Sequence, residues 1–315
     1  MRVLITGAAG FIGSNLTNFI NQQEPEWQVR GLDDLSNGDL DNLRGLDAEM
    51  IVGSLLDEDA LARAVRGVDA VVHLGALGSV PRSIGNPLAT HHANATGTLM
   101  LLEAARHAGV AHVIAASSSS VYGTNSASPK NEAHWTNPVS PYAVSKLATE
   151  GYTVAYALSY GMRTLALRFF NVYGRRQSIG HAYAAVIPQF IGRVRAGNPL
   201  LVYGDGQQSR DFTHVDSVCS VLLSALRRRT TDTRPVNVAF GSSTTINELI
   251  SVLEDAAGRR FDREHLPDRT GDVRASKADA VRLRELFPEI EPVPLRDGVL
   301  DTWRWFEAQD PNRVG

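Results

Sequence analysis

Cysteine, long apolar runs and excess charge are all scarce in this sequence. Cys219 is its one cysteine, which excludes an internal disulfide and a thiolate-rich metal site and predicts a reducing compartment. No apolar run approaches the roughly 18 residues that a bilayer-spanning helix needs. The chain also opens at Met1 without a charged and then apolar leader. We therefore expect a cytoplasmic protein with no membrane partner and no metal site.

Neither sign of charge is in large excess. The 31 lysines and arginines almost balance the 34 aspartates and glutamates, and the formal net charge is -3. This balance offers no long-range attraction for nucleic acid or for an anionic membrane, so neither is expected as a partner. Apolar content is plentiful. Of the 315 residues, 43% are hydrophobic, enough for one large domain or two interlocked ones.

Short apolar segments alternate with helix-length amphipathic segments through the first half of the chain. This rhythm predicts an α/β fold with a doubly wound parallel sheet of the Rossmann type. Segment 69–74 is apolar almost throughout, as expected for a strand that helices cover on both faces. The expected strands are 3–5, 28–32, 50–52, 70–74, 112–116 and 164–167.

The rhythm breaks down beyond Phe170, where loops lengthen and glycine and proline are scattered. We expect a smaller, discontinuous α/β region there, on the C-terminal side, with a strand at 235–239 and helices at 245–257 and 279–287. The chain then passes between the two parts more than once. Residues 1–171 with about 212–242 are assigned to the first domain, and about 172–211 with 243–309 to the second.

Three glycines, Gly7, Gly10 and Gly13, stand where the first expected strand turns into a helix. Residues without side chains let the backbone approach a pyrophosphate closely, and the helix start provides unpaired N–H groups and a partial positive charge. Asp33 follows 20 residues later, where a carboxylate accepts hydrogen bonds from the adenosine ribose and repels a 2′-phosphate. The pattern predicts a site for NAD rather than NADP. The alternative is a glycine-rich turn beside a surface aspartate.

Tyr142 and Lys146 are four residues apart and share one face of an expected helix. An ammonium group near a phenol, together with a positively charged nicotinamide, lowers the tyrosine pKa from about 10 toward neutrality, so Tyr142 is a candidate base. Ser118 follows the strand at 112–116, at the sheet edge where ligands bind in doubly wound folds. The alternatives are a common helix-surface pattern and a serine-rich loop.

With these motifs in place, the chain resembles the NAD-dependent epimerase/dehydratase family of extended short-chain dehydrogenases/reductases. Within that family it most resembles the UDP-N-acetylglucosamine and UDP-glucose 4-epimerases. The resemblance covers almost the whole chain. Besides the motifs above, it rests on segments 73–76, 94–98, 140–142, 167–174, 209–212 and 269–273.

The resemblance implies roles for individual residues. Those implied for catalysis are Ser118, Tyr142 and Lys146. Those implied for binding NAD are Gly7, Gly10, Phe11, Ile12, Gly13, Asp33, Asn37, Ser54, Leu55, Leu74, Ala76 and Asn94, together with Tyr142 and Lys146. Those implied for binding a UDP-hexose are Ser79, Ser118, Ser119, Tyr142, Asn171, Tyr203, Arg210, Arg269, Asp272 and Ser276.

Arginines 210 and 269 match the family's diphosphate-binding arginines, and guanidinium groups pair well with phosphate oxygens. Tyr203 matches the region that holds uracil. A structural ion pair for either arginine and a core position for Tyr203 stay open as alternatives. The chain departs from its relatives at Ser54, where they often carry an acidic adenine contact, and at Gly75, where alanine is more usual.

The residues after Ser118 bear on the reaction. Similar dehydratases carry aspartate and glutamate in the next two places, and similar decarboxylases carry glutamate in the second, whereas this chain has Ser119 and Ser120. Because hydroxyl groups are poor substitutes for a carboxyl pair, the resemblance favours 4-epimerisation through a 4-keto intermediate.

Ser276 matches a gate position that leaves room for an acetamido group, which favours UDP-GlcNAc and UDP-GalNAc as substrates. Interconversion of UDP-glucose and UDP-galactose stays open as a further activity. The alternatives are a UDP-glucuronate epimerase or decarboxylase, a dehydratase, and a non-catalytic NAD-binding regulator. By analogy with relatives, a homodimer is expected through helices at 88–108 and 142–160.

Overall fold

A computed structural model describes residues 1–179, 185–268 and 274–309 of the chain. Its largest sheet consists of β1 (Arg2–Thr6), β2 (Gln28–Asp33), β3 (Glu49–Val52), β4 (Ala70–His73), β5 (His112–Ser118), β6 (Thr164–Phe169) and β11 (Val236–Val238). The order is β11-β6-β5-β4-β1-β2-β3, and every neighbouring pair is parallel. This confirms the doubly wound fold. The expected strands are all present, with ends shifted by one or two residues.

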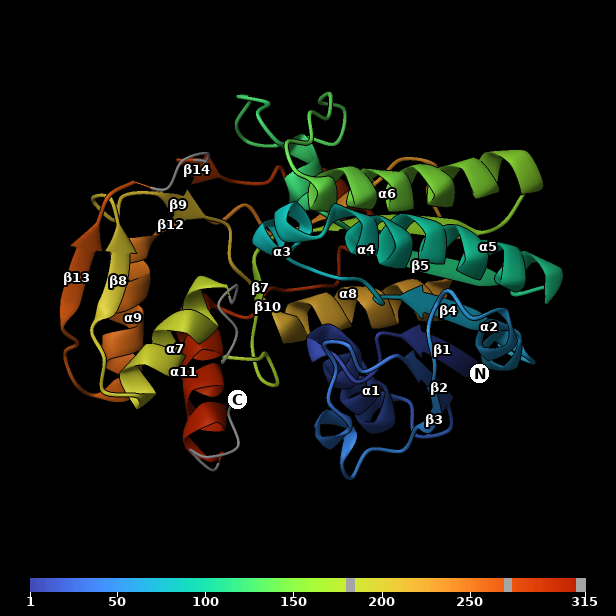
Figure 1. Ribbon diagram of the computed structural model, residues 1–315, viewed down its shortest axis with the longest axis horizontal. Helices are drawn as coiled ribbons and strands as arrows, with labels where there is room; N and C mark the ends of the chain where they lie inside the picture. The colour runs from blue at the N-terminus through green and yellow to red at the C-terminus, as the bar shows by residue number, and fades with distance from the viewer. Residues whose placement is uncertain (180–184, 269–273, 310–315) are drawn as a thin grey trace.

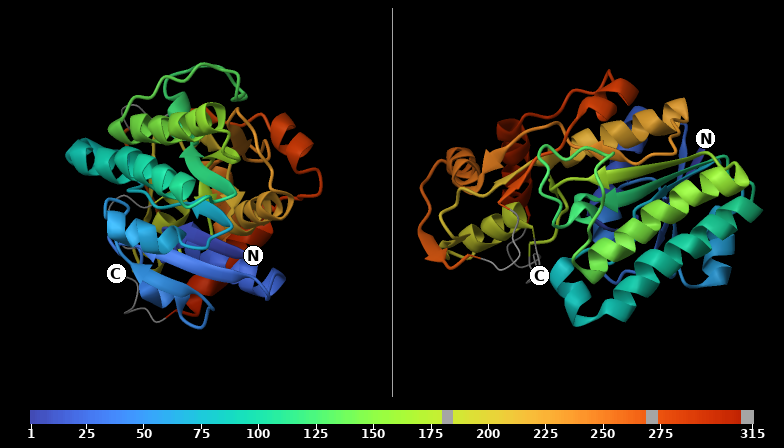
Figure 2. Two further views of the ribbon diagram at one scale, coloured as in Figure 1. Left: turned by 90° about the vertical axis from the view of Figure 1, so that its right-hand side faces the viewer. Right: turned by 90° about the horizontal axis from the view of Figure 1, so that it is seen from above.

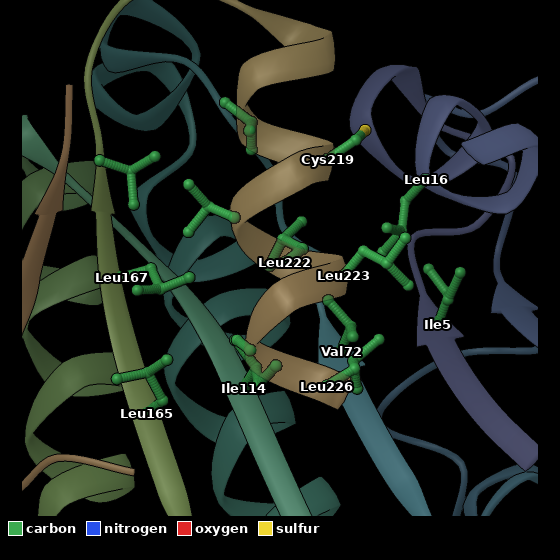
Figure 3. Close-up of a cluster of buried hydrophobic side chains, with 14 of the residues drawn as sticks. Ile5, Leu16, Val72, Ile114, Leu165, Leu167, Cys219, Leu222, Leu223 and Leu226 are labelled. Carbon is green, nitrogen blue, oxygen red and sulfur yellow. The ribbon is translucent and has the colours of Figure 1, made fainter. Parts of the chain in front are cut away.

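Helices cover both faces of this sheet, because successive strand residues point to opposite faces. Val3 and Ile5 pack into the core beneath α1 (Phe11–Gln23) and α8 (Val215–Arg228). Leu4 packs into the core beneath α2 (Glu58–Val65), α5 (Gly97–His107) and α6 (Pro141–Tyr160). Cys219 lies on buried α8, as expected, and is directed toward α1 (Figure 3). Burial raises the pKa of this thiol, so it is a packing residue.

The helix expected over 88–108 is confirmed as one unbroken helical run over 87–107, but its middle is a π-helical turn that the sequence did not predict. Helix α3 (Val80–Gly85) is followed by α4 (Pro87–His91), the π-helical turn η2 (His92–Thr96) and α5. At the centre of η2, the Asn94 carbonyl accepts the Thr98 hydroxyl at 2.5 Å and the Thr149 hydroxyl at 3.4 Å. The Gly97 N–H reaches back five residues to the His92 carbonyl, which is the bond of a π-helical turn, and the side-chain bonds add partners to the Asn94 carbonyl.

A smaller region lies beyond the carboxyl ends of the sheet strands (Figures 1 and 2). Its helices and strands are β7 (Val172–Tyr173), α7 (Val186–Arg195), β8 (Leu200–Tyr203), β9 (Ser209–Arg210), β10 (Thr213–His214), β12 (Thr244–Thr245), α9 (Ile246–Ala257), β13 (Arg263–Leu266), β14 (Ala275–Ser276) and α11 (Leu295–Glu307). The core of this region is separate and includes Phe190, Leu249 and Trp303. The expected helix at 245–257 is confirmed, with a Thr245–Glu248 capping box at its start.

The helix expected at 279–287 is α10 (Val281–Leu286). Its Leu283, and Phe287 just beyond it, pack into the core of the large sheet rather than into that of the smaller region. We therefore propose the two-domain division expected from the sequence, with α10 moved to the sheet domain. None of the helices described is long and apolar enough to cross a membrane.

Candidate active site

A cavity of 1520 Å³ opens at the carboxyl ends of the sheet strands. The glycine turn, the segment after β2, the ends of β4 and β5, and the start of α6 line one side. Residues 176–178 and the end of α11 line the other. The volume exceeds the roughly 300–1,000 Å³ typical of sites for one small ligand, and is large enough for a dinucleotide and a second molecule beside it.

The glycine turn has no room for side chains. Gly7 has φ +70°, a conformation that favours glycine. A Cβ added there would lie 2.8 Å from the Gly75 nitrogen, and one added at Gly13 would lie 2.1 Å from the Gly7 carbonyl oxygen. Gly10 caps α1 without a side chain, so the N–H groups of the first turn are left for a ligand. Phe11 and Ile12 line the cavity beside them.

Asp33 lies at the end of β2 and lines the cavity, as expected. Its carboxylate accepts the Ala9 and Leu35 N–H groups, each at 2.9 Å. Burial raises its pKa despite these bonds. Asn37 also lines the cavity and accepts a hydrogen bond from Arg82 on α3, so the segment after β2 is tied to α3.

Ser118, Tyr142 and Lys146 meet at the inner end of the cavity. Ser118 is the last residue of β5, and its Oγ accepts the Ser120 N–H at 3.1 Å and hydrogen-bonds the Tyr142 phenol. Ser140 caps α6 by accepting the Ala143 N–H at 3.1 Å, which sets where Tyr142 enters the helix. The structure thus brings the three expected catalytic side chains together.

Burial dominates the electrostatics of this trio in the protein without a cofactor. Burial lowers the pKa of Lys146 to about 8, and its Nζ donates to the Ala116 carbonyl at 2.9 Å. The pKa of Tyr142 is raised, because desolvation outweighs the hydrogen bond from Ser118. The lowering of the Tyr142 pKa expected from Lys146 together with a bound nicotinamide stays a prediction for the complex with NAD.

Asn94 does not line this cavity. It is buried beneath the wall, where its Oδ1 accepts the Leu77 N–H at 2.7 Å and its Nδ2 donates to the Ser145 hydroxyl at 2.9 Å. Asn94 therefore connects the segment after β4 to α6, one position before Lys146. The other expected cofactor residues on the cavity wall are Ser54, Leu55, Leu74 and Ala76.

The expected substrate residues fall into several groups. Ser79, Ser119 and Asn171 line the large cavity. Tyr203 and Arg210 line an adjoining cavity of 220 Å³, which shares Asn171 with the large one. Ser276 is the register partner of Arg210 on the neighbouring strand. Among the residues described, it is not one that lines either cavity. Arg269 and Asp272 lie outside the described residues.

Sequence reasoning missed some residues of the wall. Arg176 lines the cavity with φ +60°, and its Nη1 donates to Asn15 of α1 at 3.3 Å. Its position just after the 167–174 motif could have drawn attention to it. Trp305 of α11 also lines the cavity, and nothing in its local sequence indicates this. In the part of the chain that is described, no cluster of three or more histidine, cysteine or acidic residues is arranged to hold a metal ion.

Comparisons with known proteins point to one family. A model of the NAD dependent epimerase/dehydratase family matches residues 3–239. A UDP-glucose 4-epimerase of Mycolicibacterium smegmatis is 37% identical over an alignment of 312 residues that covers 97% of this chain and 98% of that protein.

Two solved structures are also similar. UDP-N-acetylglucosamine 4-epimerase from Methanobrevibacter ruminantium, in complex with UDP-N-acetylmuramic acid, has a TM-score of 0.92 and 35% identity over 98% of this chain and 99% of that one. UDP-glucose 4-epimerase from Thermus thermophilus, in complex with NAD, has a TM-score of 0.88 and 33% identity over the same shares. The chain belongs to the NAD-dependent epimerase/dehydratase family.

Proposed function

We propose that this NAD-dependent UDP-sugar 4-epimerase interconverts UDP-GlcNAc and UDP-GalNAc. The observation that supports epimerisation most is the combination of Ser118, Tyr142 and Lys146 in one cavity with a glycine turn. Near this trio the described wall carries hydroxyl groups rather than carboxylates. The acidic residues among the described lining are Asp33, at the end of β2, and Asp34, Asp39 and Asp41 on the segment that follows it.

The residues of the cavity fit NAD. The glycine turn offers backbone N–H groups and no side chains to a pyrophosphate. Asp33 offers a carboxylate to the ribose hydroxyls at the end of β2. Tyr142 and Lys146 reach the same cavity from α6. When bound, NAD supplies the acceptor and donor for the hydride at C4 of the sugar.

In the mechanism that we propose, Tyr142 takes the proton from the sugar 4-hydroxyl as C4 is oxidised, and Ser118 holds that oxygen in place. A 4-keto sugar results. After the pyranose has turned over about its diphosphate linkage, Tyr142 returns the proton as C4 is reduced on its other face. Lys146 carries its charge one helical turn from the phenol and favours the phenolate form. Asn171 and Arg210 hold the nucleotide sugar while its pyranose ring rotates.

Dehydration and decarboxylation fit this wall less well. Both reactions in similar enzymes rely on acidic residues just after the catalytic hydroxyl. Here Ser119 and Ser120 occupy η3 (Ser119–Tyr122) in that place. Neither hydroxyl group can act as a general acid or base near neutral pH with the effect of a carboxyl group.

The N-acetyl preference rests on Ser79 and on the small side chain of Ser276, which, in the part of the chain that the structure describes, lines neither cavity but is the register partner of Arg210 in the wall of the smaller one. Ser79 lines the cavity and caps α3, with its Oγ accepting the Arg82 N–H at 3.2 Å. Space next to the diphosphate side of the site is what an acetamido group requires. We expect Ser276→Tyr to remove turnover of UDP-GlcNAc while turnover of UDP-glucose is kept, with Ser276→Ala as the matched control.

The decisive experiment incubates the purified protein and NAD with UDP-GlcNAc, UDP-GalNAc, UDP-glucose and UDP-glucuronate in turn. Products are separated by chromatography, and their molecular masses are measured by mass spectrometry. Epimerisation leaves the mass unchanged, whereas loss of water or of carbon dioxide contradicts it. Conversion of UDP-glucose with UDP-GlcNAc untouched contradicts the proposed preference. NAD binding without turnover of any substrate favours a regulator.

We also propose a homodimer. Exposed apolar side chains gather on neighbouring α3, α4 and α6, including Ile84 and Leu88, which are 67% and 69% exposed, and Val144, Tyr152 and Leu158 of α6. Exposed apolar patches of this kind mark association sites. We expect light scattering to give twice the monomer mass, and Leu88→Glu with Leu158→Glu to give the monomer.

A further inference from the structure

Four segments that connect the sheet domain to the smaller region come together at one residue, Asp211, whose carboxylate is buried. Asp211 is 0% exposed. Its Oδ2 accepts the Gly241 N–H at 3.0 Å and the Ala278 N–H at 3.2 Å, and its Oδ1 accepts the Ser242 hydroxyl at 2.8 Å. The side chain of Asp211 therefore ties its own segment to the one after β11 and to the one before α10.

The backbone of Asp211 makes two further ties. Its N–H donates to the Ser276 carbonyl at 2.9 Å, which continues the pairing of β9 with β14. Its carbonyl accepts the Asn171 side-chain N–H at 3.1 Å. The Asn171 carbonyl in turn accepts the Thr213 N–H at 3.3 Å, and Asn171 has φ +34°. The segment between β6 and β7 is thus attached to the same point.

These ties lie between residues that face the two cavities. Asn171 lines both cavities, and Arg210, the neighbour of Asp211, lines the smaller one. Bonds to an ionised carboxylate are stronger than those between neutral groups. A buried carboxylate without such partners would be strongly disfavoured. The joint is therefore stiff, and a change at it is transmitted to Asn171 and Arg210 on one side and to β6 of the sheet on the other.

We propose that Asp211 is a positioning residue that holds the substrate-binding side of the cavity, Asn171 and Arg210, in register with Ser118 and Tyr142. This inference rests on the proposed epimerase function. During one turnover the sugar must lose hydride and proton at C4, turn over and regain both. A misplacement of about 1 Å in such a geometry can cost on the order of 100-fold in rate. A loosened joint also gives the 4-keto sugar time to escape before C4 is reduced.

The test is Asp211→Asn, which keeps the shape, removes the negative charge and replaces one of the two acceptor oxygens by an N–H donor. We expect kcat to fall by about 100-fold with KM changed by less than about threefold. We also expect released 4-keto sugar nucleotide, lighter than the substrate by two hydrogens, in the mass spectrum. Its release leaves the bound cofactor reduced, which the absorbance of the protein reports.

Two further variants separate positioning from stability. Leu253→Ala opens a cavity in the core of the smaller region, away from the joint. It is expected to lower the melting temperature without ketose release. Ser242→Ala removes one exposed hydroxyl donor and should fold normally. It is expected to release ketose as well, in a smaller amount than Asp211→Asn.

The outcomes distinguish the two proposals. If the unaltered protein turns over no UDP-hexose, the proposed function fails. If it does turn over substrate, the inference about Asp211 is overturned by either of two results. One is unchanged kcat without ketose release in both Asp211→Asn and Ser242→Ala. The other is that Leu253→Ala releases as much ketose as Asp211→Asn does when the two variants have lost the same amount of stability.

Discussion

Replacing Arg168 by methionine removes one half of a buried ion pair that supports the catalytic end of the sheet. Arg168 on β6 donates from Nε to Glu150 of α6 at 2.8 Å and from Nη2 at 2.6 Å. The two side chains are 4% and 8% exposed. Glu150 also accepts the Ser117 hydroxyl at 3.0 Å, next to Ser118. The guanidinium lies 4.7 Å from the centre of the Tyr122 ring. The pair therefore joins β5, β6 and α6.

The size of the stability loss depends on which of the two charges remains buried. Arg168→Met leaves the Glu150 carboxylate buried and without its main partner, which costs about 3–5 kcal/mol of unfolding free energy. At about 2 °C per kcal/mol for a large domain, the melting temperature should fall by about 6–10 °C. Loss of the cation–π contact with Tyr122 adds to this. Glu150→Gln in the same chain removes the second charge, so the double variant should recover part of the loss.

The assay is urea unfolding of the four proteins of a double-mutant cycle, with calorimetry for the melting temperatures. The losses of unfolding free energy in the two single variants should add up to more than the loss in the double variant, because each single variant leaves one buried charge without its partner. The reasoning is refuted if Arg168→Met costs less than about 1 kcal/mol, the usual value of an exposed pair. It is refuted equally if the two losses add without coupling. Arg227→Met breaks a more exposed ion pair, with Glu24, and is the matched control.

Three further outcomes are expected. Tyr142→Phe should lower kcat by on the order of 10²–10⁴ in the epimerase assay while the melting temperature is kept, and turnover within about threefold of normal would remove Tyr142 from the mechanism. Gly13→Ala places a Cβ 2.1 Å from the Gly7 carbonyl oxygen, whereas Gly10→Ala places one at 3.2 Å. Calorimetry should therefore show NAD affinity reduced by more than about tenfold in the first and less in the second. Burial lowers the pKa of Lys146 from 10.5 to about 8, so between these pH values the unfolded chain holds a proton that the folded chain has released. The contribution of Lys146 ionisation to the free energy of unfolding is therefore smallest below pH 8, and it rises as the pH rises from about 8 to 10.5. Unfolding of the cofactor-free protein should show the contribution growing by roughly 3 kcal/mol relative to Lys146→Met, and an equal pH dependence in both proteins would contradict the burial of the lysine.

The comparison of sequence with structure is clearest at the catalytic helix and its neighbour. The four-residue spacing of Tyr142 and Lys146 is enough to place both side chains on one helix face, because helical geometry is local. The same local logic predicted the helical run over 88–108 but not the π-helical turn at its centre, η2. The Asn94 carbonyl there bonds a hydroxyl from α6, a helix some fifty residues further along the chain. A pattern of apolar residues carries no information about such a partner.

By itself, the sequence determined the doubly wound sheet, the glycine turn, the Asp33 carboxylate at the end of β2 and the grouping of Ser118 with Tyr142 and Lys146. These depend on periodicity and on conformations that only certain residues adopt. Only the tertiary structure decided that Lys146 donates to Ala116, that the pKa of Tyr142 is raised in the protein alone, and that four connecting segments meet at Asp211. Desolvation and hydrogen-bond partners are set by segments far apart along the chain, and they take effect only when folding brings those segments together.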